Sequence, residues 1–182
     1  MKYNIVKGLL VVSMLLVTVS CRSASKSGSA PLIISSPSFE TGETIPPRQT
    51  CIGEDVSPPL NWTGGLDKVV SYAIICEDPD APGGTWIHWV IFDIPMQTTS
   101  LPEGVSDTPQ LEDGSKQGIN DFKKLGYGGP CPPPGKPHRY YFRLYGLDQL
   151  TGLEPGSTAD ELKDRMRGHI VAQGELMGVF GR

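Results

Sequence analysis

The chain has 182 residues, a length that suits one domain with a sizeable core and is short for two. Its 22 glycines and 17 prolines interrupt helices and supply turns, so the composition argues against a mainly helical body and favours a β-rich one. The formal net charge of −4 argues against a nucleic-acid partner, because phosphate backbones require a basic face.

The N-terminal segment has the pattern of an export signal. Lys2 and Lys7 precede an apolar run over residues 8–19, which is too short to cross a bilayer as a helix. A serine and then Cys21 follow the run, as they do in bacterial lipoprotein signals, in which the cysteine is lipidated and becomes the first residue. We therefore expect residues 1–20 to be a signal peptide that is removed, and Cys21 to carry a palmitate-type anchor.

The segment after the signal, residues 21–30, is polar and rich in serine, which predicts a flexible tether between the anchor and the domain. Arg22 stands where an aspartate would favour retention in the inner membrane, so we expect an exported protein anchored in the cell envelope at the outer membrane. Thr18 departs from the usual lipoprotein pattern, which has Leu, Val or Ile three residues before the cysteine. Ordinary secretion by cleavage elsewhere is the alternative.

Residues 31–182 form a single predicted domain with the signals of a sheet protein. Five segments rich in β-branched or aromatic residues predict strands over residues 32–34, 69–76, 86–94, 140–147 and 175–180. A capping box at residues 158–161 predicts one helix, continued by Leu162, Met166 and Ile170 at four-residue spacing and ended by Gly174.

The strand predicted over residues 86–94 is apolar on both faces, so it should lie in the centre of a sheet. Strict alternation divides its side chains into two sets, Trp86, His88, Val90 and Phe92 on one face and Ile87, Trp89 and Ile91 on the other. In the later strand the same rule points His138 and Tyr140 in one direction.

Three cysteines follow Cys21 in the chain. Cys76 ends an apolar run, which predicts a buried strand thiol. Cys51 and Cys131 both lie in loops rich in glycine and proline, where they are candidates for a disulfide in an oxidising compartment. A metal site built from these cysteines is disfavoured, because no Cys-x-x-Cys pair is present.

Two polar clusters lie at the edges of predicted strands, in loops stiffened by proline. The first contains Asp78 and Asp80 and is followed by His88, and the second leads to His138 and Tyr140. Each residue alone has a structural interpretation: His88 as a core histidine bonded to a backbone carbonyl, and the aspartates as turn-capping residues. Rigid strands beside such loops can also hold the side chains in a small pocket.

Several motifs in order carry a resemblance to a known family. They are DPDAP at residues 78–82, WIHW at 86–89, GYGGPCPP at 126–133 and PHRY at 137–140. Together they resemble the phosphatidylethanolamine-binding protein family, which includes the Raf kinase inhibitor protein, and SPPLNW at residues 57–62 resembles its bacterial branch in particular. The resemblance covers the chain from about residue 32 to its end.

The resemblance implies a mainly β fold: a sandwich with a large central antiparallel sheet, a smaller sheet and a few peripheral helices. It also implies a binding protein without catalytic activity, cofactor or metal, whose small pocket takes an anion such as phosphate or a phospholipid headgroup. Carried over to this sequence, the pocket consists of Asp78, His88, His138 and Tyr140 as polar groups, Gly128 and Gly129 as donors of backbone amides, and Pro130 and Pro132 as part of the wall.

The chemistry of these groups suits an anion, because imidazoles, a phenol and amides supply N–H and O–H donors to a phosphate oxygen. Asp78 would repel the anion, so we expect it to accept a hydrogen bond from a histidine and to hold that ring oriented and protonated, rather than to be protonated itself. Phe180 stands where many bacterial relatives have a tyrosine, so any hydroxyl which that tyrosine adds to the pocket is missing here.

Two other functions are kept as alternatives. Some family members bind kinases or proteases, so the chain is a candidate inhibitor or regulator of an envelope enzyme such as a protease, with an unknown protein target. A metal-dependent hydrolase would use Asp78, His88 and His138 as ligands, although no His-x-x-x-His spacing is present. His169, on the predicted helix, is interpreted as a packing or capping residue.

Overall fold

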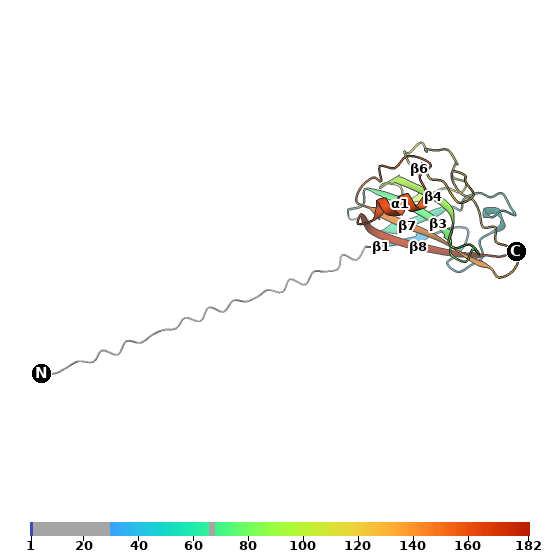
Figure 1. Cartoon of the computed structure of the whole chain (residues 1–182), viewed down its shortest axis with the longest axis horizontal. Helices are drawn as coiled ribbons and strands as arrows, with labels where there is room; N and C mark the ends of the chain where they lie inside the picture. Colours follow the sequence, from blue (N-terminus) through green and yellow to red (C-terminus); the bar gives the residue numbers. More distant parts are fainter. Residues whose placement is uncertain (2–29, 66–67) are drawn as a thin grey trace.

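The computed structural model describes Met1, residues 30–65 and residues 68–182, and strands are the main regular elements of this part. They are β1 (Ala30–Ser35), β2 (Leu60–Gly64), β3 (Ser71–Asp78), β4 (Trp86–Pro95), β5 (Ser100–Leu101), β6 (Lys116–Gln117), β7 (His138–Leu147) and β8 (Ile170–Phe180). A 3₁₀ helix, η1 (Pro47–Gln49), and one α-helix, α1 (Ala159–Met166), complete the elements of the described residues (Figure 1). Apart from Met1, the signal peptide predicted over residues 1–20 lies outside this part, as do the predicted lipidation site at Cys21 and the predicted tether up to residue 29. Within it, no helix has the length and apolar character needed to cross a membrane.

The eight strands form one sheet in the order β5-β2-β1-β8-β7-β3-β4-β6. Neighbouring strands are antiparallel except β1 and β8, which pair in parallel. The first two residues of β1 pair with β8 and residues 32–35 pair with β2, so the sheet turns at β1. This arrangement confirms the expected mainly β fold. The smaller layer consists of β1, β2 and β5, and it is a continuation of the large sheet and not a separate one.

The main core lies between the two layers. Trp62 of β2 meets Tyr72 of β3 edge to face, with ring centroids 5.6 Å apart. The opposite face of the large sheet is covered by α1, whose buried Leu162 and Met166 pack in one cluster with Val90 of β4 (Figure 1). This packing stabilises α1, because an isolated helix of eight residues is not stable in water.

The predicted helix starts where the sequence indicates and ends earlier than expected. The side chain of Thr158 accepts a hydrogen bond from the amide of Glu161, whose carboxylate accepts one from the amide of Thr158. The helix ends at Met166, and Ile170 and Gly174 belong to β8. The prediction of a helix through Ile170 is therefore wrong.

Gly168 accounts for the early end, whereas Gly174 has a different role. Gly168 has a φ of 85°, a left-handed conformation that commonly ends a helix. Gly174 lies in the middle of β8, where the carbonyl of Leu32 leaves no room for a Cβ atom. His169 lies in the turn between α1 and β8, not on the helix, and its Nδ1 is 2.9 Å from the Oδ1 atom of Asp148.

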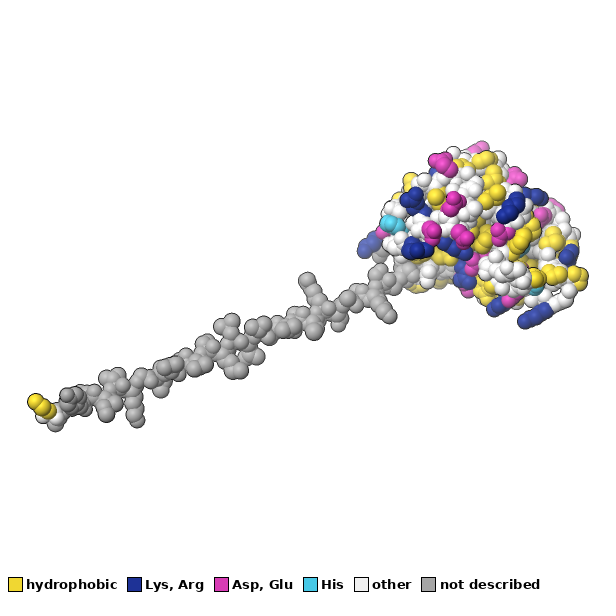
Figure 2. Space-filling view, in the orientation of Figure 1, with side chains coloured by type: hydrophobic (Ala, Val, Ile, Leu, Met, Phe, Trp, Pro, Cys, Tyr) yellow, Lys and Arg dark blue, Asp and Glu magenta, His cyan; other side chains and the backbone are white. Residues whose placement is uncertain are grey.

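Charged side chains of both signs are interspersed over the face of the domain seen in Figure 2. Basic residues gather there in small groups next to acidic ones, so this face presents no continuous basic surface. The observation agrees with the acidic balance of the sequence.

Candidate functional site

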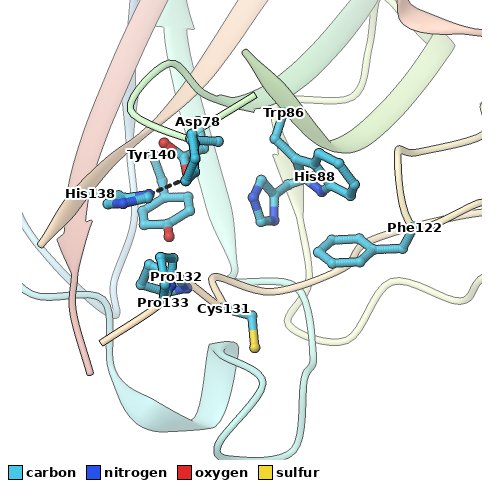
Figure 3. Close-up of a pocket in the computed structure, with 11 residues that line it drawn as sticks. Asp78, Trp86, His88, Phe122, Cys131, Pro132, Pro133, His138 and Tyr140 are labelled. Carbon is cyan, nitrogen blue, oxygen red and sulfur yellow. Dashed lines mark hydrogen bonds and ion pairs between the residues drawn. The ribbon is translucent and has the colours of Figure 1, made fainter. Parts of the chain in front are cut away.

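A cavity of about 190 Å³ opens at one end of the large sheet (Figure 3). Because β3 is antiparallel to both β4 and β7, the end of β3 lies beside the starts of these two strands. The polar side chains of the lining come from these three strand ends and are Asp78, His88, His138 and Tyr140. The other lining residues are Ala81, Pro82, Trp86, Phe122, Cys131, Pro132 and Pro133.

The end of β3 and the start of β7 are joined by a carboxylate and an imidazole. Asp78 Oδ2 lies 2.8 Å from Nδ1 of His138, and both residues are buried. The other carboxylate oxygen of Asp78 accepts the amide of Asp80, also at 2.8 Å. A carboxylate accepts and the imidazole Nδ1 donates, so Nε2 is the nitrogen of His138 that remains for a ligand.

The turn after β3 is held by an arginine of β7. The guanidinium of Arg139 donates to both carboxylate oxygens of Asp80, at 2.8 and 2.7 Å, and its backbone amide donates to the same carboxylate at 3.0 Å. The pKa of Asp80 is held well below its usual range, chiefly by the hydrogen bonds from Arg139. This bidentate pair fixes the position of the turn that carries Ala81 and Pro82 into the lining.

A bulge in β4 points His88 into the cavity. Cys76 of β3 pairs with Trp89, and the next residue, Glu77, pairs with Ile87, so His88 is an extra residue in the ladder. The face expected for His88 from strict alternation is therefore wrong. Trp89 packs in the main core, while Val90 packs against α1 on the other face of the sheet. His88 lies on the face from which Tyr140 of β7 projects, and the two rings are in contact.

The imidazole of His88 is fixed by a backbone carbonyl. Its Nδ1 lies 2.6 Å from the carbonyl oxygen of Gly128, and the side chain is buried. A carbonyl only accepts, so Nδ1 carries the proton and Nε2 is left for the cavity. Burial lowers the pKa of His88, an effect opposed by the Gly128 carbonyl and by the charges of Asp78 and Asp55. The ring is therefore neutral at neutral pH.

Tyr140 carries a buried hydroxyl that has no hydrogen-bond partner among the described residues. Its ring packs edge to face against His88, with centroids 5.1 Å apart. Burial raises the pKa of the Tyr140 phenol, and the nearby carboxylate of Asp78 raises it further, so the group keeps its proton and is a potential donor. Figure 3 shows Tyr140 between the two histidines, with its hydroxyl directed toward the proline wall.

Gly128 and Gly129 do not line this cavity, although the sequence placed their amides in the site. The amide of Gly128 donates to the carbonyl of His88 at 2.8 Å, and that of Gly129 donates to Asp55 Oδ1 at 2.6 Å. A Cβ atom at Gly129 would lie 2.6 Å from the carbonyl oxygen of Gln49. These glycines let two segments of the chain approach each other, and their amides are not free for an anion. Pro130 is likewise outside the lining.

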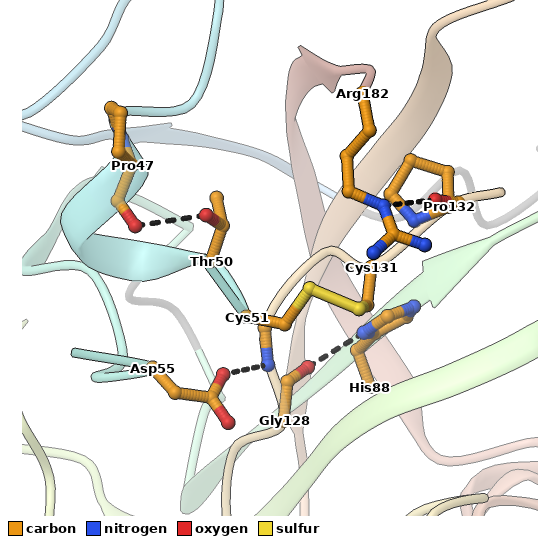
Figure 4. The surroundings of a disulfide bond; sticks show 10 residues. Pro47, Thr50, Cys51, Asp55, His88, Gly128, Cys131, Pro132 and Arg182 are labelled. Atoms are coloured by element: carbon orange, nitrogen blue, oxygen red, sulfur yellow. Dashed lines mark hydrogen bonds between the residues drawn. A yellow bond between two sulfur atoms is a disulfide. The ribbon is translucent and has the colours of Figure 1, made fainter. Parts of the chain in front are cut away.

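Cys51 and Cys131 form a disulfide with a Cα–Cα distance of 5.4 Å (Figure 4). The bridge joins the segment after η1 to the loop that supplies Pro132 and Pro133, and Cys131 itself lines the cavity. Arg182 holds the same loop, because its Nε donates to the carbonyl of Pro132 at 2.6 Å. Cys76 is a buried free cysteine, as the sequence predicted.

Two aromatic residues at the rim were not predicted as part of the site. Trp86 and Phe122 meet edge to face at 5.4 Å, and each is 38% exposed. Trp86 belongs to a motif that carried the resemblance, whereas nothing in the sequence around Phe122 marks its loop as part of a pocket. Phe180 is not in the lining and packs in the main core, where it pairs with His138 across the ladder.

Three further observations bear on the chemistry of the cavity. Among the described residues, no three His, Cys, Asp or Glu side chains are placed to hold a metal ion. Among the residues of the lining there is no serine, threonine or lysine, and Cys131 is occupied in the disulfide. His169 lies outside the lining.

The sequence was compared with protein families and with curated proteins. It matches the family model described as phosphatidylethanolamine-binding protein over residues 35–181. A protein of Methanothermobacter thermautotrophicus named UPF0098 protein is 50% identical over 144 residues, which cover 79% of this chain and 95% of that protein. A protein of the same name from Aquifex aeolicus is 44% identical over 157 residues, which cover 85% of this chain and 91% of that one.

Two solved structures have a similar fold. A structure from Chlamydia trachomatis, described as a phosphatidylethanolamine-binding protein homologue, has a TM-score of 0.75 and 36% identity, covering 85% of this chain and 98% of that one. Escherichia coli YbcL, described as a new member of the mammalian family of the same name, has a TM-score of 0.78 and 32% identity, covering 83% and 98%.

Proposed function

The chain belongs to the phosphatidylethanolamine-binding protein family, and we propose that it is a non-catalytic binding protein whose cavity takes the phosphate group of a small anion or phospholipid headgroup. The observation that carries the proposal is the buried hydroxyl of Tyr140, which has no partner among the described residues, beside two imidazoles that each keep Nε2 for a ligand. An unpartnered buried donor is costly, and a bound oxygen would satisfy it.

The protonation state of the imidazoles decides what the cavity binds. When neutral, His88 and His138 present the lone pair of Nε2, which repels an anionic oxygen. When protonated, each presents an N–H donor, and together with the hydroxyl of Tyr140 the site has three donors for one phosphate. Anion binding is therefore coupled to proton uptake, and affinity falls as pH rises.

Asp78 supports this chemistry without touching the anion. Its carboxylate accepts from Nδ1 of His138 and from the amide of Asp80, so both oxygens have partners. The hydrogen bond to Asp78 fixes the ring of His138 with Nε2 left for the ligand. We propose for Asp78 this orienting role, which the sequence predicts.

The lining favours binding over catalysis. It contains no hydroxyl nucleophile other than the phenol of Tyr140 and no free thiol, and its carboxylate Asp78 is occupied by two donors. The exposed rings of Trp86 and Phe122 provide an apolar shelf beside the donors. Such a shelf suits the organic part of a phosphate ester, so a headgroup should bind more tightly than inorganic phosphate.

Isothermal titration calorimetry of the purified protein tests the proposal. Inorganic phosphate, phosphoethanolamine and glycerol phosphate are titrated at pH 6 and pH 8, in buffers that differ in ionisation enthalpy. We expect binding that is tighter at pH 6, with proton uptake beyond that of the anion itself. Absence of binding by all three compounds at millimolar concentration would refute the proposal. Native mass spectrometry of freshly purified protein would identify a retained phosphate or headgroup.

Inhibition or regulation of an envelope enzyme, such as a protease, is the second candidate. It is favoured by the exposed pair of Trp86 and Phe122 on a rim that a disulfide and prolines make rigid. Aromatic residues are enriched in protein interfaces. A pull-down from membranes with wild type and His88→Ala separates the candidates, because loss of lipid with unchanged protein partners favours headgroup binding.

We also propose that Cys21 anchors the domain in the cell envelope after removal of residues 1–20. The family match begins at residue 35, so this segment lies outside the domain that the relatives share. Radioactive palmitate should label the wild type and not a Cys21→Ser variant. Equal labelling of the two proteins, or none of the wild type, would refute the anchor.

A further inference from the structure

A single peptide group links Asp55 to His88. The carbonyl of Gly128 accepts from His88 Nδ1 at 2.6 Å, and the amide of Gly129 donates to Asp55 Oδ1 at 2.6 Å. The carbonyl carbon of Gly128 and the nitrogen of Gly129 belong to the same planar peptide group. Figure 4 shows this group between Asp55 and His88, with one hydrogen bond on each side.

The two hydrogen bonds reinforce each other. A carboxylate that accepts from a peptide N–H polarises the group and makes its carbonyl a stronger acceptor. The stronger carbonyl in turn favours the proton on Nδ1 of His88. A hydrogen bond from Nδ1–H to a backbone carbonyl commonly sets which nitrogen of an imidazole is protonated. Asp55 thereby acts on a ring that it does not touch.

The backbone of Asp55 indicates that its position is constrained. Its φ is 59°, in the left-handed region that non-glycine residues seldom adopt, and such conformations gather at functional sites. The neighbouring segment is held to the same loop by the Cys51–Cys131 disulfide and by the amide of Cys51, which donates to the carbonyl of Pro130 at 3.2 Å. These links fix the distance between Asp55 and the peptide group.

We infer that Asp55 is a positioning residue of the cavity: through the Gly128–Gly129 peptide group it holds His88 with its proton on Nδ1 and Nε2 toward the ligand. His138 receives the same support directly from Asp78. Both imidazoles of the cavity are thus backed by a carboxylate, one in contact and one through a peptide group. The inference deepens the proposed anion site, and only its effect on affinity rests on that proposal.

Two substitutions at Asp55 separate the carboxylate from the backbone conformation. Glycine and asparagine both tolerate a positive φ, so neither Asp55→Gly nor Asp55→Asn should strain the turn. Asparagine keeps an acceptor oxygen without the charge, whereas glycine removes the acceptor. Thermal unfolding of both variants verifies that they are folded.

The main readout is nitrogen NMR of the His88 ring in the free protein, so no ligand is needed. Above the pKa of His88, the wild type and Asp55→Asn should hold the proton on Nδ1, and Asp55→Gly should shift the ratio of tautomers toward Nε2–H by about tenfold. The pKa of His88 should fall in both variants, because Asp55 and Asp78 are the charged groups that raise it and Asp78 remains. Tyr140 of β7 and Phe122 of the loop after β6 also pack on the His88 ring, and both are uncharged.

Phosphate titration of the same proteins measures the consequence for binding. We expect the dissociation constant to rise about tenfold in Asp55→Gly at pH 6, the usual scale for loss of a supporting hydrogen bond behind a ligand group, and less in Asp55→Asn. A folded Asp55→Gly protein with the tautomer and pKa of the wild type would overturn the inference, as would an Asp55→Asn protein with the tautomer shift of Asp55→Gly. If the wild type binds no phosphate, the anion site is refuted and the NMR result still decides the role of Asp55.

Discussion

Removal of the Tyr140 hydroxyl should weaken phosphate binding without lowering the stability of the fold. The hydroxyl has no partner among the described residues, so Tyr140→Phe removes a buried group without breaking a hydrogen bond within the domain. An unsatisfied buried polar group costs about 1–3 kcal/mol, so the free energy of unfolding should stay the same or rise within that range. A hydrogen bond to a charged ligand contributes about 1.5–3 kcal/mol, so the dissociation constant for phosphate should rise by about ten- to a hundredfold.

Tyr72 offers a matched control for this experiment. Its hydroxyl is also buried and has no hydrogen-bond partner within the described part of the chain, but it lies in the core between the layers and not in the cavity lining. Tyr72→Phe should match the stability change and leave phosphate binding unaltered. Urea unfolding and calorimetric titration of both variants at pH 6 provide the comparison. Unchanged phosphate affinity in Tyr140→Phe would refute the assignment of the hydroxyl as a ligand donor.

Three further predictions concern the supports of the cavity. Replacing Cys51 and Cys131 by serine removes a cross-link between residues 80 apart, which should lower the free energy of unfolding by about 4 kcal/mol, and a loss below about 1 kcal/mol in non-reducing urea would contradict this. Burial lowers the pKa of His88 in the folded state, so stability is highest above about pH 6.5, the value of the unfolded chain. It falls as pH drops from there to the lower pKa of the folded state, because the unfolded chain takes up the proton first, and His88→Gln should flatten this part of the stability profile. Gly129→Ala would place Cβ 2.6 Å from the carbonyl of Gln49 and should cost about 1–3 kcal/mol in thermal unfolding, whereas wild-type stability would show that the two segments separate freely.

The regular part of the fold was predictable because its strands follow a simple period. His138 and Tyr140 lie on one face of β7 as alternation requires, and β3 lies between β7 and β4 inside the sheet. The expectation that β4 is central is wrong, because β4 is next to the edge strand β6; its two apolar faces reflect the main core on one side and α1 on the other. The strands β5 and β6 have two residues each, so they carry no periodic signal. The start of α1 was marked by side-chain chemistry, while its end depended on the conformation of Gly168, because the apolar spacing continues into β8.

The glycines of the proline loop show a second limit of sequence reasoning. A residue without Cβ permits close approach of a ligand or of another chain segment, and the sequence does not distinguish the two. At Gly129 the neighbours are Asp55 and Gln49, which lie 74 and 80 residues earlier in the chain. Contacts at such separations follow from the packed structure and not from any local pattern. The role of Asp55 was missed for the same reason.

The bulge at His88 connects the irregular part of the fold to the chemistry of the site. In a regular β4, His88 would face α1 with Val90, and Tyr140 would have one imidazole beside it instead of two. One extra residue brings the second imidazole to the same side, and its Nδ1 is then fixed by the Gly128 carbonyl. With both rings neutral the cavity offers one donor and two acceptors, and with both protonated it offers three donors. The cavity should therefore bind phosphate in acid and, as pH rises, prefer ligands that carry their own protons, such as alcohols or ammonium groups.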